Sequence, residues 1–237
     1  MNVQNVLPVF RREIRSYFNS PVAYVVMIVF LSIIGWFFAS NLFLMNLATL
    51  RVMFELVPLV FLFFVPAVTM RLLAEEKKSG TLELLITKPV TDMEIVLGKF
   101  LAGWVLVAAA LVPTVVYLIT IMILGSPDIG PIIAGYAGLL LMGGVYVAIG
   151  LLASSLTENQ IVAFIIGFLL VFILFMLDKV LIYLPSSFAS TLEFLAIDTH
   201  FSNIARGVVD SRDILYFVSL LGFSLMLATV SLERRKW

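Results

Sequence analysis

The sequence predicts an all-α integral membrane protein with six transmembrane helices, and three observations support this prediction. Hydrophobic residues make up 62% of the 237 residues and charged residues only 13%, whereas a soluble domain is about half apolar and about a quarter charged. The mean hydropathy is +1.13, and several charge-free windows are long enough for a membrane span. The apolar runs are continuous rather than alternating with a period of two, which favours helices over barrel strands.

The composition excludes several other classes of protein. The chain has no cysteine, so it carries neither a disulfide framework nor a thiolate metal site. Its 15 basic and 15 acidic side chains balance, which argues against a nucleic-acid-binding surface. It lacks the G-x-x-x-x-G-K-[ST] phosphate-binding loop, and no ionisable side chain interrupts the apolar stretches, as an ion-coupled carrier would need. Energy for any uphill transport must therefore come from another polypeptide.

Six charge-free stretches are predicted to cross the bilayer: 22–44, 56–70, 100–124, 132–153, 161–177 and 214–232. The second and fifth are short and are expected to borrow flanking residues. With the N-terminus inside, eleven basic residues lie on one side and four on the other, counted as Arg11, Arg12, Arg15, Arg71, Lys77, Lys78, Lys88, Lys99, Arg234, Arg235 and Lys236 against Arg51, Lys179, Arg206 and Arg212. This bias predicts a multi-pass protein of the cell (inner or plasma) membrane with both termini cytoplasmic.

The expected organisation is a single transmembrane domain over residues 1–237. Its successive parts are an interfacial helix (1–20), spans one and two (22–73), a cytoplasmic segment (74–98), spans three to five (99–177), an extracytoplasmic segment (178–212), and span six with a cytoplasmic tail (213–237).

Residues 1–20 are predicted to form an amphipathic helix in the cytoplasmic interface. Its apolar and basic faces are formed by Val6, Leu7, Phe10, Ile14, Tyr17 and Phe18 and by Arg11, Arg12 and Arg15, respectively. The basic face suits lipid headgroups or a partner protein, and the sequence leaves a simple membrane anchor and a docking helix equally open. Asn19-Ser20-Pro21 is expected to end this helix and start the first span.

The cytoplasmic segment between spans two and three contains a short predicted helix bracketed by Gly80 and Pro89. Its apolar side chains are Leu82, Leu84, Leu85 and Ile86. A solvated loop without a task is the alternative, but a helix this short cannot build its own core, so its apolar face favours a partner groove. Beyond it, Thr91-x-x-Glu94 is a capping box that starts the third helix, and Lys99 is expected at the headgroups.

The remaining connections carry weaker signals. Thr157-x-x-Gln160 is a second predicted capping box, before span five. The extracytoplasmic segment is expected to hold two short helical pieces, the second ending near Gly207. His200, beside Asp198, is interpreted as an interfacial histidine bonded to a neighbour, because one histidine without cysteine is a poor metal site.

A resemblance to a known family emerges in the cytoplasmic segment. The string Leu73-Ala74-Glu75-Glu76-Lys77-Lys78-Ser79-Gly80-Thr81-Leu82-Glu83-Leu84-Leu85, followed by Pro89 and Gly98-Lys99, resembles the first cytoplasmic loop of ABC-2 type transporter permeases. In detail it is similar to gliding-motility-associated (Gld-type) and nitrous-oxide-reductase-maturation (Nos-type) permease subunits. The interfacial helix, the six spans and the tail Glu233-Arg234-Arg235-Lys236-Trp237 match that family as well.

The resemblance implies a mechanism and a set of contact residues. In such permeases the short helix after the second span is a coupling helix that docks on a cytoplasmic ATPase subunit, and the interfacial helix lies beside it. Carried over by position, the contact residues are Glu76, Gly80, Thr81, Leu82, Glu83, Leu84 and Leu85, with Arg11, Arg12, Glu13 and Arg15 on the interfacial helix. ATP and Mg are then bound by the ATPase, and this chain has no cofactor or catalytic residue of its own.

The expected function is that of a non-enzymatic permease, paired with a second permease copy and driven by the separate ATPase. Two alternatives stay open: an intramembrane protease or lipid transferase, and a mechanotransmission complex that drives a periplasmic partner while nothing crosses. The H-E-x-x-H and G-x-S-x-G motifs are both missing, which counts against the enzyme. The second copy is either identical or a paralogue, and a periplasmic accessory protein is a further partner that the resemblance leaves open.

Overall fold

The computed structural model describes residues 3–46, 48–81, 90–180 and 193–234, and all regular structure in these residues is helical. The helices are α1 (Val3–Asn19), α2 (Pro21–Leu44), α3 (Arg51–Thr69), α4 (Arg71–Lys78), α6 (Asp92–Leu111), the 3₁₀ turn η1 (Val112–Thr114), α7 (Val115–Leu124), α8 (Ile129–Leu156), α9 (Gln160–Val180), α11 (Ile197–Ala205) and α12 (Ser211–Glu233). Six helical segments are long and apolar enough to cross a membrane, which confirms the six predicted spans.

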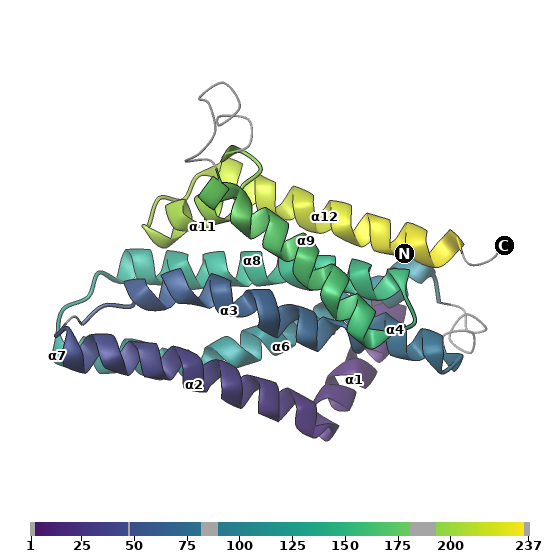
Figure 1. The fold of residues 1–237 in the computed structure, drawn as a ribbon, viewed down its shortest axis with the longest axis horizontal. Helices are drawn as coiled ribbons and strands as arrows, with labels where there is room; N and C mark the ends of the chain where they lie inside the picture. The colour runs from purple at the N-terminus through teal and green to yellow at the C-terminus, as the bar shows by residue number, and fades with distance from the viewer. Residues whose placement is uncertain (1–2, 47, 82–89, 181–192, 235–237) are drawn as a thin grey trace.

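The spanning helices run along the longest axis of the molecule (Figure 1). α8 lies at the centre, in contact with α3, α6, α9, α11 and α12, and it is the most buried of the six spans. Its glycines allow the close approach: a Cβ added at Gly150 would lie 2.0 Å from Thr69 Oγ1 of α3, and one at Gly143 would lie 2.8 Å from Val107 Cγ1 of α6. Small residues at such contacts let helix backbones pack tightly within lipid.

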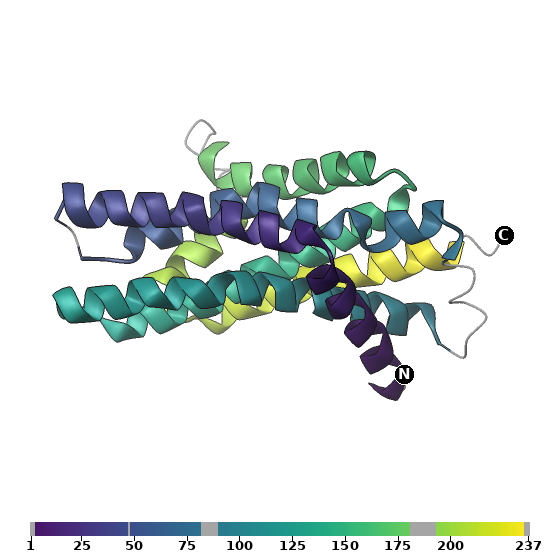
Figure 2. The same cartoon turned by 90° about the horizontal axis from the view of Figure 1, so that it is seen from below.

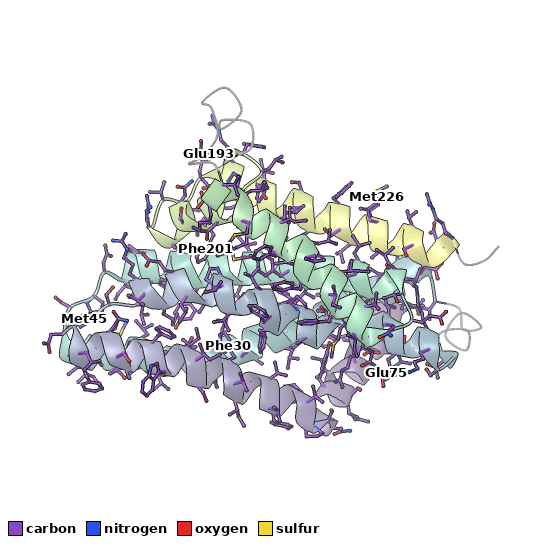
Figure 3. All side chains as sticks on the ribbon, in the orientation of Figure 1. Phe30, Met45, Glu75, Glu193, Phe201 and Met226 are labelled. Carbon is purple, nitrogen blue, oxygen red and sulfur yellow. The ribbon has the colours of Figure 1, made fainter. Side chains whose placement is uncertain are left out.

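Both described ends of the chain lie at one end of this bundle, as an even number of crossings requires (Figure 1). We call it the terminal end; α4 lies there too, and Glu75 on α4 and Met45 at the end of α2 mark the terminal end and the opposite, distal end in Figure 3. α1 crosses the long axis obliquely instead of running along it (Figure 2). The terminal end therefore gathers the interfacial helix and the segment that the sequence marks as cytoplasmic.

Local capping signals explain where several helices begin. Ser20 accepts a hydrogen bond from the Val22 amide, and Pro21 occupies the first position of α2. The predicted capping box of Thr91 and Glu94 is present and starts α6.

The second predicted capping box is wrong by two residues. α9 begins at Gln160, and Asn159 Oδ1 accepts from the Ile161 amide at 2.9 Å. Thr157 instead accepts from the Asn159 amide at 3.1 Å. Asparagine is as good an N-cap as threonine, so the nearer residue takes the role.

The distal end contains α11 and a broad hollow of about 1500 Å³ between α3, α8, α9 and α11. His200 is hydrogen-bonded, as expected, and it is also buried: its Nδ1 lies 2.6 Å from Asp213 Oδ1 at the start of α12, and its Nε2 lies 3.0 Å from the Phe194 carbonyl oxygen. Asp198 instead pairs with Lys179 at 2.7 Å. Gly207 follows α11 with a φ of +88°, a conformation that favours glycine.

Candidate functional site at the end that holds both termini

The candidate site at the terminal end of the bundle is built from α1, α4, the first turns of α6 and the last turns of α8. α1 packs on α6, and α4 packs on α8. α4 begins directly after α3, so it extends the second span beyond the apolar stretch. This end of the molecule therefore contains the described part of the segment that the sequence singles out.

Lys99 is the centre of this region. Its side chain is completely buried, and its ammonium group lies 2.9 Å from Glu13 Oε1, 2.8 Å from Glu76 Oε2 and 2.6 Å from the Leu72 carbonyl oxygen. The expectation that Lys99 reaches the headgroups is wrong. α1 covers the start of α6, so the lysine faces protein and finds its acceptors there.

Two carboxylates and two cations form a closed cluster around Lys99. Arg12 forms ion pairs with Glu13 and with Glu76, and these carboxylate side chains are only 12% and 14% exposed. Burial raises the pKa of Glu13, but Lys99 and Arg12 lower it by more, so this pKa lies below its usual value. The cluster is electrically balanced and joins α1, α4 and α6.

α1 is fixed on α6 by shape as well as by charge. A Cβ added at Gly98 would lie 2.8 Å from Val9 Cβ and Cγ1 and 3.1 Å from the Val6 carbonyl, so glycine is what allows α1 to lie this close. Further along, the Tyr17 hydroxyl donates to the Val68 carbonyl at 2.9 Å, and the Arg71 guanidinium lies over the Tyr17 ring. The buried face of α1 thus packs on protein along its length.

Ser154 of α8 organises the junction between α3 and α4. Its hydroxyl accepts from the amides of Leu73 and Ala74, at 3.0 Å each, and donates to the Met70 carbonyl at 2.8 Å. α3 ends at Thr69 and α4 begins at Arg71, so Ser154 bonds the backbone at the break between the two helices. Lys77 adds a second tie from α4 to α8, through the Ser155 carbonyl.

The sequence-predicted contact residues fall into three groups. Glu13 and Glu76 point into the cluster, and Arg12 is half-exposed at its edge. Arg11, Arg15, Gly80 and Thr81 are exposed, and Gly80 has a φ of +69°, which ends the turn after α4. Leu82, Glu83, Leu84 and Leu85 lie outside the described residues.

Sequence reasoning missed the buried role of Lys99 and the whole contribution of Ser154. The capping box locates the start of the helix that carries Lys99, but it does not indicate that α1 packs over this lysine. Gly150 and Ser154 form a small-xxx-small pair in the sequence, and such a pair is a signal that this face of α8 approaches another helix. Among the described residues, no group of three His, Asp or Glu side chains is placed to hold a metal.

A comparison with protein families gives one match. A family model described as ABC-2 family transporter protein matches residues 49–232, well over half of the chain. That range includes α4, the start of α6 and the end of α8. No curated protein matches the sequence.

The match agrees with the geometry already described, namely six apolar spans and a charged segment between the second and third. The described part of that segment is packed against α1, α6 and α8. The family match does not distinguish the gliding-motility or nitrous-oxide types from other branches of the family. The chain is a multi-pass membrane protein and belongs to the ABC-2 family of transporter proteins, whose members are permease subunits of ABC transporters.

Proposed function

We propose that this permease subunit couples ATP hydrolysis by a separate cytoplasmic ATPase to export or to conformational signalling across the membrane. The ATPase supplies ATP and Mg binding, and the present chain contributes the moving helices. The terminal end is the cytoplasmic end in this proposal, in keeping with the excess of basic residues there.

The single observation that supports the coupling role best is the continuity between the segment after the second span and the bundle. Glu76 lies on this segment and is paired with Lys99 of the third span and Arg12 of α1. Ser154 and Ser155 of the fourth span hold the same segment from the other side. A force applied just beyond α4 therefore acts on three other helices at once. Rigid-body switching of this kind is common in molecular machines.

The proposed ATPase contact comprises Glu76, Gly80, Thr81, Leu82, Glu83, Leu84 and Leu85, with Arg11, Arg12, Glu13 and Arg15 of α1 beside it. Apolar residues supply the anchoring area of such a contact, and charges at its edge set orientation. Arg11 and Arg15 are exposed and free to take that second role, whereas the carboxylates of Glu13 and Glu76 act from inside the cluster.

A second permease copy completes the proposed assembly, because two paired ATPases present two docking surfaces. α9 supports this arrangement: it packs on α3 and α8, while large apolar side chains such as Ile165, Leu169 and Ile173 stay exposed. Lipid is the alternative cover for this face. Single cysteines at Leu169 should cross-link between two copies if the face is a dimer interface, and they should not if lipid covers it.

The test of the coupling role is co-purification with the ATPase subunit. The double variant Glu83→Lys/Leu84→Asp should lower ATPase recovery at least tenfold while membrane insertion persists. Glu193→Lys/Leu195→Asp at the distal end is the matched control and should leave recovery unchanged. Undiminished recovery with the first variant would remove the assignment of this segment to the ATPase.

A further inference from the structure

The Lys99 ammonium group is held by three oxygen atoms of the protein. Its Nζ donates hydrogen bonds to Glu13 Oε1 at 2.9 Å and to the Leu72 carbonyl oxygen at 2.6 Å, and it forms an ion pair with Glu76 Oε2 at 2.8 Å. One of these oxygen atoms belongs to α1, and two belong to α4. The lysine itself belongs to the third span, so a single side chain joins three helices.

The charges around Lys99 leave little freedom for these helices to separate. Arg12 and Lys99 balance Glu13 and Glu76, and Lys99 is completely buried. A small shift of α1 or α4 would separate the ammonium from a carboxylate while protein still covers it, and such a loss is strongly unfavourable. Close packing of Gly98 against Val9 opposes the same separation by shape.

We infer that Lys99 is a positioning residue that locks α1, α4 and α6 into one rigid unit. Displacement of the segment after α4 is then passed to the third span and to α1 together, instead of being absorbed by bending at Met70, between the end of α3 and the start of α4. This inference rests on the proposed function only for the source of the displacement, which is the ATPase. The rigid connection of α1, α4 and α6 through Lys99, which we call the lock, is a property of the chain alone.

The lock can be tested by measuring the separation of α1 and α4 directly. The chain has no native cysteine, so nitroxide labels at Arg15→Cys and Lys78→Cys, both exposed positions, report on these two helices without background. In the otherwise native chain without any ATPase, the distance distribution should be narrow. In Glu13→Gln/Lys99→Met, it should be at least twice as wide.

This double variant is chosen because it removes one cation and one anion, so the cluster stays neutral and folding is spared. If Lys99 merely balanced charge, the distribution would stay narrow, and that result would overturn the lock. The matched control Lys179→Met/Asp198→Asn removes the ion pair at the distal end and should leave the 15–78 distribution unchanged. A control as broad as the test variant would also overturn the inference, because the effect would not be specific to Lys99.

The transmission step requires the complex with its ATPase. The 15–78 distribution of the native chain should coincide in the nucleotide-free and ATP-trapped states, because α1 and α4 move together; a nucleotide-dependent change would refute the rigid unit. If no ATPase binds the native chain, the proposed function fails, while the distributions of the isolated chain still decide whether Lys99 is a lock.

Discussion

At the terminal end, charged side chains are paired while buried in protein, unlike the exposed ion pairs elsewhere on the surface. Glu13 and Lys99 are paired within protein, where removing one partner of a buried pair typically costs about 3–5 kcal/mol. An exposed pair such as Arg51 with Glu55, at 73% and 65% exposure, is worth at most about 1 kcal/mol. The stability of this end of the molecule is therefore expected to depend on very few side chains.

Acid should weaken the fold through Glu13. Its pKa is lower in the folded chain than in the unfolded one, so the ionised carboxylate stabilises the fold at neutral pH, and this contribution disappears as the pH falls through the folded pKa. Glu13→Gln should therefore lower the Tm in detergent at pH 7, and the difference from the native chain should shrink toward about pH 3. A difference in Tm that is constant across this range would contradict the assignment.

Ser154→Ala should destabilise the junction of α3 and α4. The change removes one hydroxyl that serves three backbone groups, and each buried polar group left unpaired costs about 1–3 kcal/mol. The backbone groups of α4 keep their own helical bonds, so we expect a loss of about 2 kcal/mol, measured as a lower Tm. Ser219→Ala, which removes a hydroxyl bonded only within its own helix, is the control and should cost less. Equal losses of stability in the two variants would show that Ser154 does not stabilise the junction of α3 and α4 through these three bonds.

At the level of whole helices, the sequence predicted existence and type well and packing poorly. Charge-free length gave all six spans, and the pairing of Thr91 with Glu94 gave the start of α6, because both signals are local. The partners of Lys99 and Ser154 lie 23 to 86 residues away, and no periodicity within a helix encodes such distances. The amphipathic pattern of residues 1–20 was right, but it could not show that Val6, Val9 and Tyr17 would be covered by protein.

The docking of α1 on α6 should be sensitive to one methyl group. Gly98→Ala would place a Cβ 2.8 Å from Val9, and the resulting strain should cost about 1–3 kcal/mol. Gly222→Ala is the matched control, since nothing lies within 4 Å of its added Cβ, and replacing a helical glycine there should stabilise by about 0.5–1 kcal/mol. Opposite shifts in Tm are expected, and shifts of the same sign would show that α1 does not lie as closely on α6 as described.

For the molecule as a whole, the proposed function requires an apolar bundle without ionisable groups in the middle of its spans to respond to events at one end. α8 is surrounded by its neighbours, and its last turn holds α4 through Ser154 and Ser155. Its first turns lie beside α11 and the distal hollow. A displacement at the terminal end thus has a direct helical route to the other side of the membrane, some 40 Å away for 28 residues at about 1.5 Å each.

A cytoplasmic ATPase can act on α4 only if the terminal end faces the cytoplasm, and single-cysteine labelling tests this topology. The chain has no cysteine of its own, so Lys78→Cys on α4 and Arg206→Cys after α11, both exposed, can be labelled one at a time. Because the predicted topology puts eleven basic residues on the cytoplasmic side and four on the other, a membrane-impermeant maleimide should label position 206 in intact cells and position 78 only after permeabilisation. The reverse pattern would invert the topology and place α4 out of reach of any cytoplasmic ATPase.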